Sequence, residues 1–373
     1  MTKRIPLFEI YWDDADITSV TQAISSGRNW AIGPYVNLFE DKIRNYVRVK
    51  YARVFSSGTS ALHSALLAYN IGPADEVIVP SFTFIATANA PLFVGAKPVF
   101  ADIEEQTFGL DPEQVNERIT HRTKAIIPVH YGGCPSQIRE LKKIAQDNRL
   151  ILIEDAAESF GARIGTAPVG SFGDAAMFSF CQNKIVSTGE GGAITTDSEQ
   201  ICNRLEIIRS HGQSHSRYQL LKNDDADYVA LGYNFRMSNI TAALGVTQLD
   251  KVEALIDMRR ENARYLTSKL KREVQHVTLP SPPPTYRHVY QMYTIRHPQR
   301  DQLMQHLFEK GIMTKVYFHP VHKSYFYTNI LKDTSNLPVT EEIASQVLSL
   351  PMFPHLKKEE IDRVVSEIGI CTS

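Results

Sequence analysis

The sequence predicts an α/β protein with a mostly parallel sheet, followed by a smaller α+β domain. Between Val36 and Gly192, short apolar runs alternate with helical segments, a pattern typical of a parallel sheet with helices on both faces. The run Leu150–Ile153 is apolar at every position, as expected of a strand buried on both faces. After about residue 250 the alternation is lost, so we assign residues 1–250 to the large domain and 251–373 to the small one.

Each element of the large domain follows from local pattern. A helix is expected over Asp13–Ser26, because Ile17, Val20 and Ile24 recur at helical spacing, and Gly27–Tyr35 is expected to be a loop. The expected strands are Arg53–Phe55, Glu76–Val79, Pro98–Ala101, Lys124–Val129, Leu150–Glu154 and Ala175–Phe180. The expected helices between them are Thr59–Tyr69, Thr83–Val94, Asp111–Thr120 and Ser136–Asn148. Packing of residues 1–30 on the small domain is an alternative to their place in the large one.

The later elements are less regular. A helix over 197–211 precedes a polar loop that extends to about Asp227, and a long helix runs from its cap at Ser238 to Leu270. The Pro-rich segment Pro280–Pro284 is expected to be a surface connector. Four elements are expected after it: strands Val289–Ile295 and Lys315–Phe318, and helices Asp301–Lys310 and Lys358–Ile368.

Composition excludes several classes of protein. Among 373 residues, 40 basic and 41 acidic side chains give a net charge of -1, which predicts neither a nucleic-acid partner nor a membrane surface. No stretch approaches the ~20 apolar residues of a membrane span, and the start lacks the apolar core of a signal peptide. Four cysteines without CxxC spacing predict no disulfide framework and no zinc site. We therefore expect a cytoplasmic protein without a metal.

Lys184 is the first candidate for chemistry. It stands between the strand-like run Ala175–Phe180 and the glycine-rich loop Thr188–Gly192. Strand ends in alternating α/β chains face ligand crevices, where a partly desolvated lysine can act as a nucleophilic amine. A lone lysine is more often a solvated loop residue, so this hypothesis depends on residues elsewhere in the chain.

Gly58, Thr59 and Ser60 follow an expected strand at the start of an expected helix. A helix N-terminus offers backbone N–H groups and a positive dipole end, Gly58 permits close approach, and the two hydroxyls add donors. The segment is therefore a candidate phosphate cup, although it has neither a P-loop ending nor GxGxxG. From this segment alone, an ordinary capped helix is the commoner explanation.

Two carboxylates and two further side chains complete the candidate site. Asp155 ends a buried strand, where it needs a cationic or hydrogen-bonding partner. A protonated ring nitrogen would satisfy it and stay protonated beside it, and a helix cap is the alternative. Glu158 could face the same pocket. Phe84 could stack on a planar ring or pack in the core, and Ser179, just before Lys184, could bind phosphate.

These five features together match one cofactor. Pyridoxal 5′-phosphate needs donors for its phosphate, an acid for its pyridine nitrogen and a lysine for its aldehyde. A stacking ring and a second hydroxyl suit the same molecule. We therefore predict pyridoxal 5′-phosphate as the cofactor.

Nine segments that span nearly the whole chain carry a family resemblance. They are Ser57–Leu62, Pro80–Thr87, Glu154–Glu158, Gly173–Asp174, Phe178–Phe180, Asn183–Lys184, Thr188–Gly192, Gly232–Asn239 and Tyr317–His322. As a set they resemble the DegT/DnrJ/EryC1/StrS family of sugar aminotransferases. The resemblance implies the aspartate-aminotransferase type fold (fold type I for pyridoxal phosphate enzymes), with the cofactor bound by the large domain.

The resemblance also implies roles for individual residues. Lys184 would bind the cofactor aldehyde covalently, Asp155 would pair with the pyridinium nitrogen and Phe84 would stack on the ring. Glu158 would lie near the phenolic oxygen. Some relatives carry histidine where Lys184 stands and catalyse dehydration, so the lysine favours transamination here.

The phosphate site is expected to contain residues from two subunits. Gly58, Thr59, Ser60 and Ser179 would hold it within one chain. By resemblance, Asn234 would reach it from the partner subunit. This implies a homodimer with shared active sites.

The expected reaction moves an amino group from an amino acid, glutamate by family analogy, to a nucleotide-linked keto-sugar. Asn183–Lys184 and Thr188–Gly192 resemble members that aminate C4 of NDP-4-keto-6-deoxyhexoses. A keto-cyclitol (inosose) aminotransferase and a catalytically silent cofactor-binding regulator are alternatives. The candidate substrate residues are Trp30, Tyr35, Arg236, Tyr317, His319 and His322.

Overall fold

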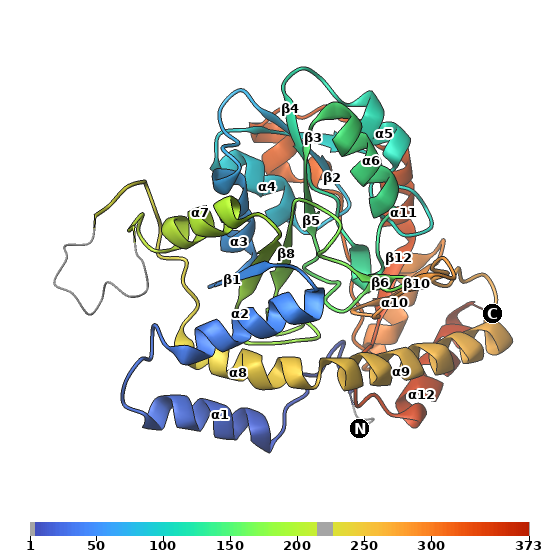
Figure 1. Cartoon of the computed structure of the whole chain (residues 1–373). Coiled ribbons are helices and arrows are strands. Elements are labelled where there is room, and N and C mark those ends of the chain that lie inside the picture. The colour runs from blue at the N-terminus through green and yellow to red at the C-terminus, as the bar shows by residue number, and fades with distance from the viewer. Residues whose placement is uncertain (1–3, 215–226, 373) are drawn as a thin grey trace.

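The centre of the protein is a seven-stranded sheet (Figure 1), in a computed structural model that describes residues 4–214 and 227–372. The strand order is β1-β9-β8-β5-β4-β2-β3. The strands are β1 (Tyr51–Phe55), β2 (Glu76–Pro80), β3 (Lys97–Ala101), β4 (Thr123–Ile126), β5 (Ile151–Asp155), β8 (Ala175–Ser179) and β9 (Gly192–Thr196). All neighbours from β8 to β3 are parallel, whereas β9 runs antiparallel to β8 and β1. The predicted α/β class with a mostly parallel sheet is confirmed.

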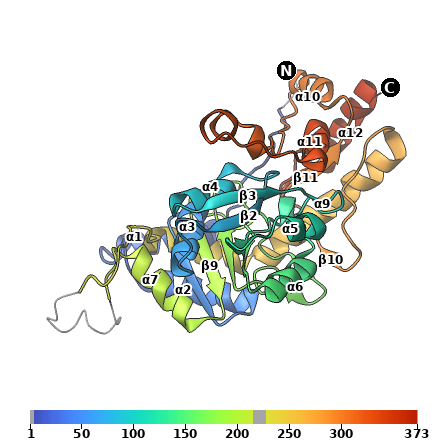
Figure 2. The ribbon, with the colours of Figure 1, turned by 90° about the horizontal axis from the view of Figure 1, so that it is seen from above.

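Helices cover both faces of this sheet, as Figures 1 and 2 show. They are α2 (Pro34–Val47), α3 (Gly58–Ala68), α4 (Ile85–Phe93), α5 (Pro112–Glu117), α6 (Ile138–Asn148), α7 (Glu199–Arg209) and α8 (Asn239–Asp250). Alternate residues of β8 join opposite cores: Ala175 and Met177 pack in the cluster of α3, and Ala176 and Phe178 in that of α2. The strand is therefore buried on both faces, as a central strand of such a sheet must be.

A third hydrophobic cluster gathers the C-terminal elements around α9 (Val252–Glu273). It contains residues of α10 (Arg300–Glu309), α12 (Lys358–Thr372) and the antiparallel strands β11 (Tyr293–Arg296) and β12 (Val347–Leu350). Helix α11 (Pro338–Gln346) leads into β12. This separate core supports our proposal of a small domain from about residue 251.

Short elements fill the connections. Strands β6 (Arg163–Ile164), β7 (Ala167–Pro168) and β10 (Tyr286–Arg287) form a three-stranded sheet. The single turns are η1 (Tyr131–Gly133), η3 (Val321–Lys323) and η4 (Phe326–Ile330). Within residues 4–214 and 227–372, no helix has both the length and the apolar composition needed to cross a membrane.

The N-terminal segment contacts both parts of the molecule. Ile5 lies beside Ile312 in a parallel bridge and joins the C-terminal hydrophobic cluster. Helix α1 (Asp14–Ser25) packs along α8, where Ser19 Oγ donates to the carbonyl of Ala243 at 2.9 Å. The first described residues therefore lie against the C-terminal part, and α1 lies against the large part.

Two expected elements are different in the structure. The helix expected over Ser238–Leu270 is two helices, because Lys251 leaves helical geometry with φ -102° and ψ 5°. The strand expected over Lys315–Phe318 is only a single bridge between Lys315 and Ser349. The polar loop expected to extend to about Asp227 lies, over residues 215–226, outside the described residues.

Several of the described elements have no counterpart in the sequence-based expectation. The longer ones are α2, α11, β9 and β12. Strand β9 begins at Gly192, within the glycine-rich segment that predicted a loop, and its burial is complete. Glycine content masked the strand, because the backbone of Gly192 pairs with both β1 and β8 without a side chain.

Candidate functional site

The turn from β1 into α3 carries Gly58 and Thr59. Ser57 and Ser60 form a capping box in which each hydroxyl oxygen accepts the other residue's backbone N–H at 3.1 Å. A Cβ atom on Gly58 would lie 3.2 Å from the Cβ of Ser179, so the helix start and the end of β8 approach closely. First-turn amides have no partner within a helix and attract anions. The structure therefore brings Gly58 and Ser179 together, but commits the hydroxyl of Ser60 to the cap instead of a ligand.

Asp155 lies at the same edge of the sheet, at the end of β5, and is only 4% exposed. Its Oδ2 accepts the Thr87 hydroxyl at 2.7 Å, and its Oδ1 accepts the Ala157 N–H at 3.1 Å. Burial raises the pKa of Asp155, and the hydrogen bond from Thr87 opposes that rise. A carboxylate has about four acceptor positions, so this one can accept a further proton donor such as a ring N–H.

Lys184 is held on the loop that joins β8 to β9. The neck of this loop is closed by Phe180, whose N–H donates to Gly191 at 2.9 Å and whose carbonyl accepts from Thr188 at 2.8 Å. Lys184 Nζ lies 3.6 Å from Glu158 Oε1, and both side chains are largely buried. The lysine amine thus lies beside Glu158 and close enough to Asp155 to interact with it electrostatically, so the three side chains form one cluster.

Three residues outside the predicted set hold this cluster in place. The N–H of Gly132 donates to Glu158 Oε2 at 2.9 Å, and the side-chain amide of Gln291 donates to the carbonyl of Asn183. Thr87 is the third. It belongs to a segment that carried the family resemblance, so a signal for it existed. Gly132 and Gln291 come from segments without such a signal, and only tertiary structure brings them here.

Phe84 and Tyr317 lie near residues of this cluster: Tyr317 near Glu158, and Phe84 in the same segment as Thr87. Phe84 caps α4, three residues before Thr87, and is 61% exposed, so its ring is available to a ligand. Its ring centroid lies 6.4 Å from that of Phe318. Burial raises the pKa of Tyr317, while His319 is exposed.

Trp30 and Tyr35 flank the start of α8. The carbonyl of Trp30 accepts the Asn239 N–H, and the Tyr35 N–H donates to the Asn239 side chain, both at 2.9 Å. Trp30 is 54% exposed although its indole N–H donates to the carbonyl of Ile24 at 3.2 Å, so the ring surface, not the N–H, is open to another molecule.

Asn234 and Arg236 lie beside the strand that leads into the phosphate cup. The backbone of Arg236 bridges Phe55, the last residue of β1, and that of Asn234 bridges Ser210. The Asn234 side chain is exposed and that of Arg236 is half-buried. Neither residue is shown in contact with Lys184 or Asp155, and the role of Asn234 in a partner's site stays a prediction.

His322 lies elsewhere than expected. It is only 2% exposed; its Nδ1 lies 2.6 Å from Ser81 Oγ and its Nε2 lies 3.2 Å from Glu341 Oε1. Burial lowers the pKa of His322. With both ring nitrogens engaged inside the protein, the structure argues against contact with a sugar, and His322 instead fastens η3 to the end of β2.

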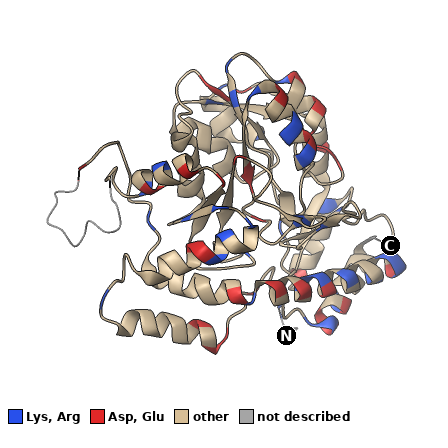
Figure 3. Cartoon of the chain, in the orientation of Figure 1, with Lys and Arg blue, Asp and Glu red and all other residues tan. Residues whose placement is uncertain are grey.

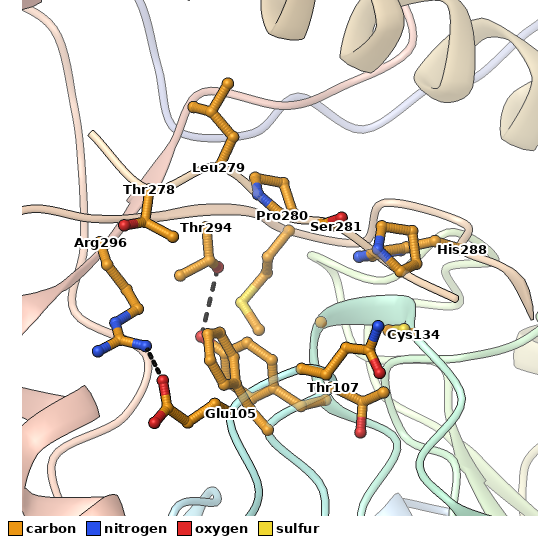
Figure 4. Close-up of a pocket in the computed structure, with 16 residues that line it drawn as sticks. Glu105, Thr107, Cys134, Thr278, Leu279, Pro280, Ser281, His288, Thr294 and Arg296 are labelled. Carbon is orange, nitrogen blue, oxygen red and sulfur yellow. Dashed lines mark hydrogen bonds and ion pairs between the residues drawn. The ribbon is translucent and has the colours of Figure 1, made fainter. Parts of the chain in front are cut away.

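A cavity of about 220 Å³ is lined by residues of η1 and β11 and of the segment 278–282 (Figure 4). Gly132 lines this cavity and its N–H also donates to Glu158, so η1 connects the cavity to the candidate site. At one side Arg296 pairs with Glu105 at 2.8 Å. None of the predicted site residues is among the described residues that line it.

The residues at the carboxyl edge fit pyridoxal 5′-phosphate. The start of α3 and Ser179 offer donors to a phosphate, and the absence of a side chain on Gly58 leaves room beside Ser179. Asp155 offers a buried acceptor to a ring nitrogen, and Lys184 offers an amine. These are the partners that the cofactor's phosphate, ring and aldehyde require.

Comparison with known proteins gives a match along nearly the whole chain. Residues 11–369 match the model of the DegT/DnrJ/EryC1/StrS aminotransferase family. The chain is 38% identical over 343 residues to a GDP-perosamine synthase of Caulobacter vibrioides, covering 91% of this chain and 90% of that protein. It is 37% identical over 357 residues to a Geobacillus stearothermophilus protein named as a pleiotropic regulatory protein, covering 95% and 94%.

Solved structures agree with this match. DesV of S. venezuelae superposes with a TM-score of 0.91 at 32% identity, covering 100% of this chain and 99% of that one. The fold class, the cofactor and the enzyme class predicted from the sequence are therefore confirmed. This chain belongs to the DegT/DnrJ/EryC1/StrS aminotransferase family, whose members are pyridoxal 5′-phosphate-dependent sugar aminotransferases.

Proposed function

We propose that this enzyme moves an amino group from glutamate to C4 of an NDP-4-keto-6-deoxyhexose. The observation that carries the chemistry is the cluster in which Lys184 Nζ lies 3.6 Å from Glu158 and interacts with the buried Asp155. The likeness to a GDP-perosamine synthase supports a nucleotide-linked sugar as the acceptor.

Each residue of the pocket has a defined task in this proposal. When bound, pyridoxal 5′-phosphate supplies an aldehyde that condenses with amines and a ring that delocalises the electrons of a carbanion. Asp155 holds the proton on the ring nitrogen, and the amine of Lys184 moves the proton at the α-carbon of the amino donor. Gly58 and Ser179 fix the phosphate end. Glu158, bound to the backbone of η1, holds its carboxylate beside the reacting amine.

We further propose a homodimer in which Asn234 completes the partner's site. Large apolar side chains are exposed on and between α1 and α2, including Ile24, Trp30, Ile32 and Leu38. Exposed apolar groups that gather on one face mark protein contacts. A second copy of the chain that covers this face would bury them. The cytoplasmic location stays a prediction.

Replacement of Lys184 tests the proposed chemistry directly. Lys184→Ala and Lys184→Arg should abolish both the absorbance band of the lysine-bound cofactor and the half-reaction with glutamate. Lys143→Ala, an exposed residue of α6, is the matched control and should leave both intact. A Lys184→Ala protein that retains the band and the half-reaction would exclude Lys184 as the attachment site.

A panel of acceptors tests the substrate. NDP-4-keto-6-deoxyhexoses, 3-keto nucleotide sugars and inososes are offered with glutamate, and the products are read by mass spectrometry and NMR. We expect amination at C4 of a nucleotide sugar. Amination of inososes alone would favour the cyclitol alternative. No half-reaction with any amino donor would favour the regulator alternative.

A further inference from the structure

Two threonine hydroxyls lie in line behind Asp155. Thr87 Oγ1 lies 2.7 Å from Asp155 Oδ2, and Thr83 Oγ1 lies 2.9 Å from Thr87 Oγ1. All three residues are at most 4% exposed. Thr83, Thr87 and Asp155 therefore form a hydrogen-bonded row inside the protein, next to the start of α4.

The direction of the hydrogen bonds in this row depends on the charge of Asp155. An ionised carboxylate can only accept, so Thr87 must donate its single proton to Asp155. The oxygen of Thr87 is then left as an acceptor, so Thr83 must donate to it. If Asp155 were protonated, its O–H could donate to Thr87, and both hydroxyls could turn round. The arrangement in which both hydroxyl protons point toward Asp155 therefore stabilises the ionised form of its carboxylate.

The backbone around Asp155 is also fixed. Its N–H donates to the carbonyl of Pro128 at 2.8 Å, and its carbonyl accepts the N–H of His130 at 3.0 Å. The side chain is then oriented by Thr87 on one oxygen and by the Ala157 N–H on the other. A single hydroxyl thus controls the position of the oxygen that Ala157 does not bind.

We propose that Thr87, supported by Thr83, is a positioning residue that keeps Asp155 ionised and aimed at the cofactor's ring nitrogen. This inference rests on the proposed function, in which Asp155 holds the proton on that nitrogen. The same short segment carries Phe84, so α4 would control both the face and the nitrogen of the ring. Burial works in the opposite direction, because it raises the pKa of Asp155, and the hydrogen bond from Thr87 offsets part of that rise.

Three variants separate the hydroxyl from the volume it occupies. Thr87→Val removes the hydroxyl at nearly constant size, Thr87→Ser keeps it, and Thr83→Val removes only the second member of the row. We expect Thr87→Val to slow the half-reaction with glutamate roughly 10- to 100-fold, as loss of a hydrogen bond to a charged group does. Thr83→Val should have a smaller effect, and Thr87→Ser should restore most of the rate.

A matched control exists in the same protein. Thr340 Oγ1 donates to Asp102 Oδ1 at 2.7 Å, and both residues are buried, but Asp102 caps α11 rather than facing the pocket. Thr340→Val therefore removes the same kind of hydrogen bond elsewhere. This variant should lower the thermal stability of the apoprotein. It should change neither the affinity for the cofactor nor the protonation of the cofactor's ring nitrogen.

The readout that does not depend on activity is the protonation of the ring nitrogen. Holoenzymes loaded with ¹⁵N-labelled pyridoxal 5′-phosphate are titrated with pH, and the ¹⁵N chemical shift is followed by NMR. In the wild type and in Thr340→Val the nitrogen should stay protonated throughout. In Thr87→Val it should lose its proton within the titrated range, and cofactor affinity should fall.

Each outcome bears on one hypothesis. If the ring nitrogen stays protonated in the wild type, and Thr87→Val shows the same titration and the same half-reaction rate, the proposed role of Thr87 is overturned. A wild-type protein without half-reaction overturns the proposed function instead. If Thr87→Val does not fold, the comparison of Thr83→Val with Thr340→Val decides, and identical behaviour of these two variants overturns the row.

Discussion

Gly58→Ala is a direct test of the phosphate cup, because the structure shows which atoms the added methyl group would contact. A Cβ atom at this position would lie 3.1 Å from Met177 Sδ and 3.2 Å from Ser179 Cβ. Both contacts are tighter than ordinary van der Waals separation. Met177 and Ser179 belong to β8, which is paired on both sides by β5 and β9 and has little freedom to shift.

The two opposing effects of this substitution can be compared. Gly58 is the first residue of α3, where alanine suits the backbone and restricts the unfolded chain, a gain of about 0.4–1 kcal/mol. Overpacking of a dense core costs about 1–3 kcal/mol. The net effect is therefore a loss of up to about 2.5 kcal/mol of stability in the apoprotein. Movement of Ser179 should in addition lower cofactor affinity by roughly tenfold or more, since a displaced donor loses about one hydrogen bond to a charged group.

Denaturant unfolding of the apoprotein and a fluorescence titration with pyridoxal 5′-phosphate measure the two effects. Gly72→Ala is the matched control, because the nearest atom to its added Cβ, the carbonyl oxygen of Val94, lies at 3.8 Å. The control should keep wild-type cofactor affinity. Wild-type affinity in Gly58→Ala would mean that the phosphate does not bind between α3 and Ser179.

Three further predictions follow from the same pocket. Burial raises the pKa of Asp155 above its ordinary 3.8, so the folded protein holds this proton more tightly and loses stability as pH rises above that value. Asp155→Asn should therefore raise the melting temperature of the apoprotein at neutral pH, and the gain should shrink toward pH 4; a gain that is independent of pH would contradict this. If sites are shared between subunits, mixing Lys184→Ala with an inactive Asn234→Ala protein and refolding them together should restore activity in hybrid dimers, whereas no recovery would place Asn234 outside the partner's site. Gln291→Leu should release the carbonyl of Asn183 and speed hydrogen exchange of the Lys184 loop, measured by mass spectrometry, and unchanged exchange would show that the clasp does not restrain the loop.

The sheet was largely predictable because its pattern is local. Leu150–Ile153 is apolar at every position, and a strand with that pattern has to be covered on both faces. Strand β9 was not predictable in the same way. Its first residue is the last glycine of the segment that indicated a loop, and only pairing with β1 and β8 makes it a strand. Likewise, a local helical pattern continued through Lys251, where the structure separates α8 from α9.

The candidate site divides along the same line. Asp155 and Lys184 were found because each stands at the end of an apolar run, and a strand end has a fixed place in such a sheet. The partners of His322 and Ser60 could not be inferred from residue type. Ser60 is held by its own helix cap, and His322 binds Ser81, which is 241 positions away in the sequence. Sequence thus located the groups that contact a ligand better than the groups that hold them.

The order and direction of the strands explain why Lys184 lies at the same edge of the sheet as the phosphate cup and Asp155. In the order β1-β9-β8-β5, the phosphate cup follows β1 and Asp155 ends β5, with two strands between them. Because β9 runs antiparallel to β8, the short connection between these two strands stays at the carboxyl edge instead of crossing the sheet. That connection carries Lys184. Since neighbouring strands lie about 4.8 Å apart, the cup and the acid are about three such steps apart, with the lysine loop between them. A parallel β9 would need a crossover helix and would take the lysine away from this edge, so the single reversed strand is the feature of the sheet on which the site depends.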